Sequence, residues 1–394
     1  MISKLDNPKV RQFIQSHIND NPADIALQGQ KNPELPIREI ADQIASRQRA
    51  AKKLPEWYSN KKVIFPPRQN LEQASSERTA KFKTRFCSGK RLLDLTGGTG
   101  IDAFYLSEIF EEVTVVEPNQ ELCALIAHNF EAFEKKVNIH QQKAEAFLET
   151  NNQRYDVIYI DPSRRPDGEK RVFGLGEYLP NVIDLQNKLL DIGDLVIIKT
   201  SPMIDISDTV QHLQGVSKVV TLAVQHEMKE VLFFMQKGWE TEPDIETYNL
   251  LHNVEQVFKF QKSDEKATWV DFSEPLSFIY EPNSAVRKAG GFKSVADQFG
   301  LEKLHQQTHL YTSDSLISDF PGKTFRFIEL VKPDKKVFKR AFKDGKVNVI
   351  SKNYPLGANE IKKKYSLKDG GEAFLIFCEI SGLGKSVLIC EIVN

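Results

Sequence analysis

The sequence predicts an α/β fold with a parallel-sheet core, a helical N-terminal segment and a C-terminal α+β part. Between residues 62 and 240, short apolar runs alternate with segments of helical periodicity, which is the pattern of strand–helix units in a parallel sheet. Before this region the apolar residues follow helical spacing, and the chain ends in a β-α-β-α-β-β succession. More than one class of domain is therefore expected.

The length of 394 residues is too great for a single hydrophobic core. We predict an N-terminal helical segment at residues 1–61, the parallel-sheet core at 62–240, an α+β linker or ferredoxin-like module at 241–319, and a last small module at 320–394. The basic run at residues 47–53 lies in the N-terminal segment. We interpret it as a solvated helix face, although contact with a phosphate backbone is the alternative.

The composition excludes several classes of protein. The net charge is −1, so any affinity for nucleic acid must come from a local patch. The cysteines Cys87, Cys123, Cys378 and Cys390 are scattered without a C-x-x-C pair, which argues against a metal site and suits a cytoplasmic protein. No run approaches the roughly 20 apolar residues of a membrane span. The composition leaves the oligomeric state open.

The segment at residues 92–102 organises the predicted core. Its apolar run ends in Asp94, glycines follow, and a helix-like segment begins near Ile101. Gly98 and Gly100 allow the backbone to approach a ligand, and the helix directs free N–H groups into the turn. This pattern predicts a cofactor cradle, with an ordinary strand–helix turn or a nicotinamide dinucleotide site as the alternatives.

Two further strand ends carry acids. The run at residues 113–116 ends in Glu117, which is placed to accept the two ribose hydroxyls of a nucleoside. A second apolar run at residues 156–160 ends in Asp161-Pro162-Ser163-Arg164-Arg165. Each acid would alone be read as a solvated strand end, but together with the glycine turn they predict one site.

These motifs resemble class I S-adenosylmethionine (SAM) methyltransferases with a C-terminal THUMP-like domain. The resemblance is carried by residues 73–80, 94–102, 161–165 and 281–290 and by the final α+β module. The core is also similar, more loosely, to the RNA cap guanine-N2 methyltransferases. The resemblance implies a Rossmann-like core of seven strands that closes with an antiparallel pair at residues 219–224 and 231–235.

The resemblance also implies a cofactor site for SAM. Ser76 and Thr79 would fold over the methionine end, although the same residues suit a simple helix cap. Ala144 and Glu145, after the third strand, would meet the adenine. The cofactor-binding candidates are Ser76, Thr79, Asp94, Thr96, Gly98, Gly100, Asp102, Glu117, Ala144 and Glu145.

Amino-methylating members of this class carry D/N-P-P-aromatic at the position of Asp161. A carboxylate and a backbone carbonyl there hold the N–H groups of an exocyclic amine and turn its lone pair toward the methyl group. Here Ser163 and Arg164 replace the second proline and the aromatic residue. Phe173 or Tyr178 is the candidate for the missing ring. We predict Asp161, Pro162, Ser163 and Arg164 as catalytic residues.

The resemblance implies N-methylation of a base in rRNA or tRNA. A small-molecule methyltransferase and a SAM-binding RNA adaptor without catalysis are the alternatives. Basic residues outnumber acidic ones between residues 320 and 370, as phosphate binding requires. The RNA-contact candidates are Arg165, Phe173, Lys335, Lys336, Lys339, Arg340, Lys362 and Lys363.

Overall fold

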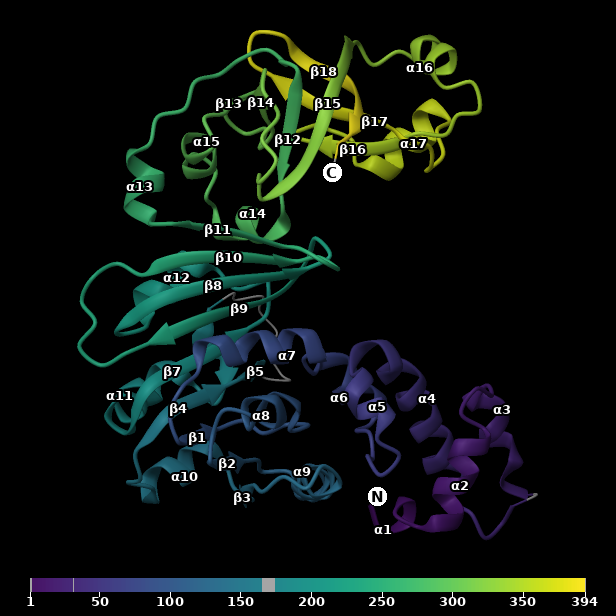
Figure 1. Cartoon of the computed structure of the whole chain (residues 1–394), viewed down its shortest axis with the longest axis vertical. Helices are drawn as coiled ribbons and strands as arrows, with labels where there is room; N and C mark the ends of the chain where they lie inside the picture. The colour runs from purple at the N-terminus through teal and green to yellow at the C-terminus, as the bar shows by residue number, and fades with distance from the viewer. Residues whose placement is uncertain (1, 31, 165–173, 394) are drawn as a thin grey trace. The chain divides into compact units, whose positions relative to one another are not determined.

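The computed structural model describes residues 2–30, 32–164 and 174–393, and the chain forms two units (Figure 1). The first unit comprises Met1–Ser217 and Phe233–Glu240, and the second comprises Lys218–Leu232 and Thr241–Asn394. Each unit is described separately below. No helix in the described part of the chain combines the length and apolar character that crossing a membrane requires.

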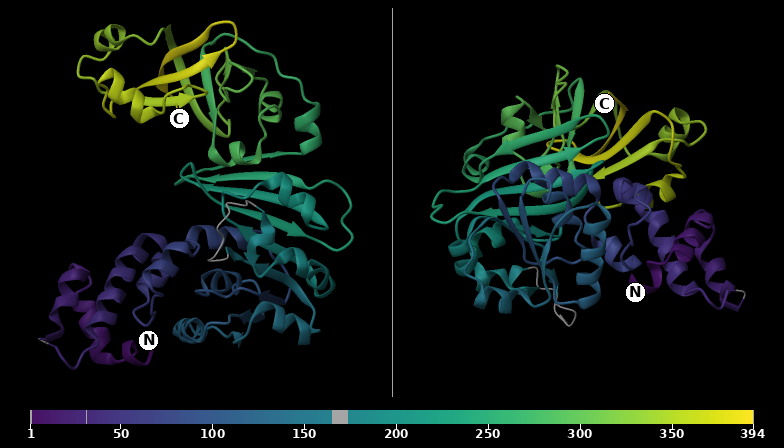
Figure 2. Two further views of the ribbon diagram at one scale, coloured as in Figure 1. Left: turned by 180° about the vertical axis from the view of Figure 1, so that it is seen from behind. Right: turned by 60° about the horizontal axis from the view of Figure 1, so that its bottom comes forward.

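The first unit begins with short helices around one long helix. Their buried apolar side chains, such as Ile40 and Ile44 of α4, share one cluster with Leu125 of α9. Figure 2 shows this segment as the purple end of the unit in both orientations. The helices are α1 (Ile2–Leu5), α2 (Pro8–Ser16), α3 (Pro22–Ala26), α4 (Ile37–Lys53), α5 (Pro55–Ser59), α6 (Arg68–Gln73) and α7 (Glu77–Lys83).

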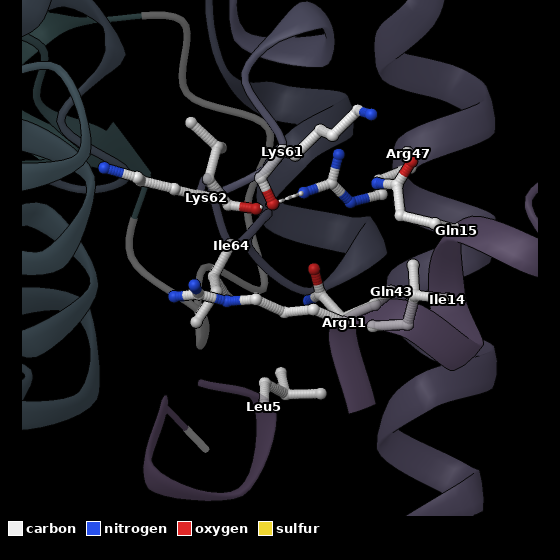
Figure 3. A pocket seen from close by; sticks show the side chains of 10 residues that line it. Leu5, Arg11, Ile14, Gln15, Gln43, Arg47, Lys61, Lys62 and Ile64 are labelled. Atoms are coloured by element: carbon white, nitrogen blue, oxygen red, sulfur yellow. Dashed lines mark hydrogen bonds between the residues drawn. The ribbon is translucent and has the colours of Figure 1, made fainter. Parts of the chain in front are cut away.

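The basic run on α4 is held by the protein itself. Arg47 is only 4% exposed, and its guanidinium donates hydrogen bonds to the carbonyl oxygens of Lys61 and Val63; Figure 3 shows the contact with Lys61. Lys53 donates to the carbonyl oxygen of Leu71 at 2.7 Å. The interpretation of the run as a solvated face is therefore wrong for Arg47. Its buried guanidinium group instead binds the backbone of the segment that leads into β1 (Arg91–Asp94).

The parallel strands of the first unit confirm the predicted parallel sheet. Their order is β7-β4-β1-β2-β3, and each neighbouring pair is parallel, so the direction of strand succession reverses on either side of β1, where such sheets bind ligands. These strands are β1 (Arg91–Asp94), β2 (Glu112–Val116), β3 (Asn138–His140), β4 (Tyr155–Ile160) and β7 (Gly193–Thr200). Two further strands, β8 (Val216–Val224) and β9 (Glu227–Met235), have residues in both units.

Helices connect these strands as the periodicity predicted. Trp57 of α5 is fully buried, and its ring meets Phe104 of α8 edge-on at 5.2 Å. The connecting helices are α8 (Ile101–Leu106), α9 (Gln120–Ala132), α10 (Ala144–Thr150), α11 (Val182–Ile192) and α12 (Ile206–His212). A short antiparallel pair follows β4 and consists of β5 (Ser163–Arg164) and β6 (Tyr178–Leu179).

The second unit contains a seven-stranded sheet of order β13-β14-β12-β15-β18-β17-β16. In addition, residues 218–224 of β8 pair in parallel with β10 (Asp244–Leu250), which pairs with β11 (Glu255–Phe260). The remaining strands are β12 (Phe278–Pro282), β13 (Glu302–Lys303), β14 (Tyr311–Ser313), β15 (Gly322–Val331), β16 (Asn348–Lys352), β17 (Ala373–Ile380) and β18 (Gly384–Ile392).

The helices of this unit complete the predicted β-α-β-α-β-β succession. It runs β15, α16, β16, α17, β17 and β18. In this sheet β15 and β17 each pair antiparallel with β18, and β16 pairs parallel with β17. The helices are α13 (Lys262–Ala267), α14 (Ser284–Ala289), α15 (Ser294–Gln298), α16 (Lys335–Ala341) and α17 (Ala358–Tyr365).

We expect Arg47→Ala to lower the free energy of unfolding by about 1–3 kcal/mol, because it leaves two carbonyl groups of residues 61–63 without their donor. Arg49→Ala is the matched control on the same helix. Its partner Glu72 is exposed, so the loss should stay within about 1 kcal/mol. Urea denaturation of both variants measures the difference, and equal losses would contradict the structural role of Arg47.

Candidate active site

The glycine turn after β1 is shaped by close packing. Gly98 and Gly100 adopt left-handed backbone angles, with φ of 52° and 76°. A Cβ added to Gly97 would lie 2.4 Å from Val115 Cγ1, and one added to Gly100 would lie 2.8 Å from Ile126 Cγ1. At Gly98 the nearest atom would be the Thr96 carbonyl oxygen at 3.7 Å. Gly97 and Gly100 are therefore needed for packing, whereas Gly98 leaves room for a ligand at the backbone.

A cavity of about 310 Å³ lies over this turn. It brings together three motifs that the sequence analysis identified separately: the residues before α7, the glycine turn, and the end of β4. The cavity is lined by Asn70, Gln73, Ala74, Ser75, Asp94, Thr96, Gly97, Gly98, Thr99, Ile101, Asp102, Tyr159, Asp161 and Ser163. Polar groups converge on a partly open cavity, as expected of a small-ligand site.

Asp94 closes β1 and is only 1% exposed. Its carboxylate accepts a hydrogen bond from the backbone N–H of Thr96 at 3.0 Å. Burial raises the pKa of Asp94 to about 8, and the charges of Asp102 and Asp161 act in the same direction. At neutral pH, burial therefore keeps Asp94 mainly as a neutral acid.

Glu117 follows β2 and supports the turn from the other side. Its two carboxylate oxygens accept from the backbone N–H groups of Gly98 and Asn119, each at 2.8 Å. Burial raises the pKa of Glu117. These contacts fix the carboxylate beside Gly98, although neither Glu117 nor Gly100 is among the described residues that line the cavity. The role of Glu117 toward a ribose stays a prediction.

Asp161 lies directly after β4 and lines the cavity. Its backbone N–H donates to Thr96 Oγ1 at 2.7 Å, and its Oδ2 lies 2.6 Å from Lys199 Nζ. The loss of solvent contact raises the pKa of Asp161, while the positive charge of Lys199 opposes this rise. Thr96 thus joins the glycine turn to the end of β4.

The neighbours of Asp161 take different positions. Pro162 is buried, whereas Ser163 is exposed and lines the cavity. Arg164 lies on β5, paired with Tyr178 of β6. Tyr178 is buried and is not among the described residues that line the cavity. The predictions for Arg165 and Phe173 fall outside the described residues.

A buried ion network lies beside the cavity, and sequence reasoning did not identify its lysines as site residues. Asp102 Oδ1 lies 3.0 Å from Lys83 Nζ, and Asp102 Oδ2 lies 3.2 Å from Lys199 Nζ. Ser75 Oγ donates to Asp102 Oδ2 at 2.8 Å. Burial alone would raise the pKa of Asp102, but Lys199 and Lys83 hold it below its usual range. The apolar run before Lys199 was the only local signal for its position.

Other predicted cofactor residues do not line this cavity. Ser76 and Thr79 form a capping box at the start of α7, with the Thr79 N–H donating to Ser76 Oγ at 3.2 Å. Their neighbour Ser75 faces the cavity instead. Ala144 and Glu145 begin α10, after β3. The roles of these four residues toward a cofactor stay predictions.

The predicted RNA-contact lysines lie in the second unit. Lys335, Lys336, Lys339 and Arg340 are exposed on α16. On α17, Lys363 is exposed and Lys362 pairs with Asp369 at 2.7 Å. Phe338, on the same helix α16, is 1% exposed and belongs to the core.

Three protein families match successive segments of the chain. Residues 74–219 match the family Conserved hypothetical protein 95. Residues 278–321 match a ferredoxin-like domain, and residues 322–391 match a THUMP domain-like family.

A solved structure matches along nearly the whole chain. It is a candidate methyltransferase of Porphyromonas gingivalis W83, with 31% identity, a TM-score of 0.89 and coverage of 98% of both chains. The ribosomal RNA small subunit methyltransferase J of Coxiella burnetii (strain RSA 331 / Henzerling II) is 35% identical over 78 residues, or 18% of this chain. The chain spans 31% of the length of that relative.

The sheet order and the glycine turn are those of the class I methyltransferase fold, and the chain ends in a match to a THUMP domain-like family. The chain belongs to the family of the Porphyromonas gingivalis protein, with which it aligns almost from end to end. The fold class and the family implied by the sequence are therefore confirmed.

The raised pKa of Asp94 predicts a pH-dependent stability. Between about pH 4 and pH 8, Asp94 is ionised in the unfolded chain but protonated in the folded chain. The free energy of unfolding of the wild type therefore falls as the pH rises through this range. In Asp94→Asn this loss is absent. The free energy of unfolding of Asp94→Asn, minus that of the wild type, should therefore increase with pH by at most about 1.4 kcal/mol per pH unit.

Urea denaturation at pH 5 and pH 8 measures this gain. Asp156→Asn is the control, because the backbone N–H groups of Arg91 and Lys90 lower the pKa of Asp156. Asp156 is therefore ionised in both the folded and the unfolded chain from pH 5 to pH 8, and the difference between this variant and the wild type should stay constant. A constant difference between Asp94→Asn and the wild type across this pH range would show that Asp94 is ionised in the folded protein.

Proposed function

We propose that this protein methylates an exocyclic amine of a base in RNA, with SAM as the methyl donor. The observation that carries the proposal is the cavity that joins the glycine turn after β1 to Asp161 after β4. The turn is the cofactor half of the site, and Asp161 is the substrate half. The curated relative from Coxiella burnetii is an rRNA methyltransferase by name, which supports RNA as the substrate class.

The residues present fit SAM. Gly98 leaves open space at its backbone, Glu117 is fixed beside it, and Asp94 and Ser75 present polar groups to the cavity. When bound, SAM supplies an electrophilic methyl group for an in-line displacement. The chain's own contribution is to bind and orient the two reactants, which is where most of the barrier reduction in such a transfer arises.

Asp161 is the group that orients the amine. Its carboxylate accepts an N–H bond of the amine and thereby directs the nitrogen lone pair toward the methyl carbon. The nitrogen forms the new bond to carbon as the sulfur–carbon bond breaks, and the amine then loses one proton to solvent. Asp161 need not act as a strong base in this scheme.

RNA is the partner that we propose for the second unit. The exposed cations of α16 lie on a module that matches the THUMP-like family. We also propose a cytoplasmic location, which suits the free thiols of Cys87, Cys123, Cys378 and Cys390.

Tritiated SAM, incubated with the protein and with rRNA, tRNA or a metabolite extract, tests the function. Asp161→Ala should lower the turnover by about 100- to 1000-fold, because an orienting acceptor is lost at the transition state. Binding of S-adenosylhomocysteine, measured by calorimetry, should persist in this variant. Glu117→Ala should instead weaken that binding by about 1–3 kcal/mol.

Asp191→Ala is the matched control, since Asp191 is an exposed aspartate that pairs with Lys237. Labelling of the metabolite extract alone would indicate a small-molecule methyltransferase. Binding of RNA and S-adenosylhomocysteine without any labelling would indicate an RNA adaptor, in line with the replacement of the second proline by Ser163. Full activity of Asp161→Ala would contradict its role.

The RNA-binding surface has its own test. Changing Lys335, Lys336, Lys339 and Arg340 together to glutamine should weaken RNA binding. It should also reduce the slope of log affinity against log salt by about 0.7–0.9 for each phosphate contact that is lost. Filter binding across a salt series measures both quantities.

A control variant carries the same change at the exposed lysines Lys52, Lys61, Lys62 and Lys136 of the first unit. If both variants bind RNA like the wild type, α16 does not contact RNA. If the control variant loses as much affinity as the α16 variant, the effect is one of net charge alone.

A further inference from the structure

Lys199 occupies a central position beneath the cavity. It is the next-to-last residue of β7, and its side chain is 9% exposed. Its Nζ lies 2.6 Å from Asp161 Oδ2, 3.2 Å from Asp102 Oδ2 and 3.2 Å from Ser75 Oγ. The ammonium group therefore connects the end of β4 with the first turn of α8 and with the segment before α7.

Asp102 is the anchor of this arrangement. Lys83, whose side chain is 1% exposed, lies 3.0 Å from Asp102 Oδ1, and Ser75 donates to Asp102 Oδ2 at 2.8 Å. Asp102 Oδ1 thus forms an ion pair with Lys83, and Oδ2 accepts a hydrogen bond from Ser75. An aspartate held in this way keeps its negative charge and cannot rotate freely, so it fixes the position of the Lys199 ammonium group.

Three of the four charged side chains in this network are buried, and the fourth is partly exposed. The side chains of Lys83, Lys199 and Asp102 are at most 11% exposed, whereas that of Asp161 is 38% exposed and lines the cavity. Burying ion pairs seldom adds stability, because desolvation costs about as much as the attraction returns. A purely structural purpose would not require one end of the network to face the cavity.

We propose that Lys199 is a positioning residue that, anchored on Asp102, holds the Asp161 carboxylate ionised and oriented toward the methyl-accepting amine. The inference rests on the proposed function. Lys199 contacts Asp161 Oδ2, and we assign the other carboxylate oxygen, Oδ1, to the amine. The backbone N–H of Asp161 is fixed separately by Thr96 Oγ1.

Removing Lys199 has a defined electrostatic consequence. Loss of solvent contact already raises the pKa of Asp161, and Lys199 provides the largest opposing effect. Without this ammonium group the pKa of Asp161 rises further, so a larger fraction of Asp161 is protonated at neutral pH. A protonated carboxyl group has a different hydrogen-bonding pattern and no longer carries the charge that orients the amine.

The first experiment is kinetic and uses Lys199→Met and Lys199→Arg. In Lys199→Met the acid limb of the pH–kcat profile should move upward by about one to three pH units, as when an aspartate loses a neighbouring cation. Affinity for S-adenosylhomocysteine should change little, and Lys199→Arg should restore much of the neutral-pH rate because it keeps the charge.

Lys188→Met is the control, because Lys188 contacts Asn152 at the surface of the same unit. A pH profile of Lys199→Met that matches the wild type would overturn the proposal. A loss of rate that is equal at every pH would also overturn it, since this would indicate a structural role only.

The second experiment does not depend on activity. Thermal midpoints of Lys199→Met, Asp161→Asn and the double variant form a double-mutant cycle at pH 7. We expect Asp161→Asn to recover part of the midpoint that Lys199→Met loses, because the unpaired carboxylate is then removed. Additive effects would overturn the coupling. If the wild type methylates no substrate, the proposed function is wrong. The cycle still measures whether Lys199 and Asp161 are energetically coupled, because it does not depend on activity.

Discussion

The parallel pairing of β1 with β4 is the constraint on which the candidate site depends. In this register Asp94 lies opposite Tyr159, and the N–H of Leu95 continues the ladder to the Tyr159 carbonyl oxygen at 2.9 Å. Both strands end at the same edge of the sheet, so Asp161 reaches Thr96, which lies 65 positions earlier in the chain. A slip of one residue would turn the strand-end side chains to the opposite face.

The charges around the cavity must be balanced because three carboxyl groups meet there. Asp102 and Asp161 contact the buried lysines, and Asp94 contacts a backbone N–H instead. Burial and the other two aspartates together raise the pKa of Asp94. The two lysines thus place positive charge beside Asp102 and Asp161, while burial favours the neutral form of Asp94.

Helix α16 of the C-terminal module places its aromatic residue Phe338 in the core and its lysines on the surface. Phe338 packs edge-on against Tyr365 at 5.0 Å and near Phe377 at 5.7 Å, which directs the lysines of α16 to the outside. Phe338 also belongs to the apolar cluster that contains Val347, Ile361 and Leu375, so it is a core residue rather than a surface on which a base could stack.

The sequence by itself determined the class of fold, the glycine turn and the acids at the strand ends. These features depend on local rules: periodicity of apolar residues, the φ angles open to glycine, and the short distance from a strand to its turn. The boundaries of α4, α16 and α17 were predictable for the same reason, since each helix carries its own apolar face.

Only the tertiary structure decided which charged residues belong to the site. Lys199 and Asp102 are 97 positions apart, and Lys199 and Ser75 are 124 apart, so no local pattern links them. The burial of Arg47 depends in the same way on carbonyl groups of residues 61 and 63. A lysine or arginine in a sequence is solvated unless packing removes water from it and supplies a partner, and that is decided by the assembled fold.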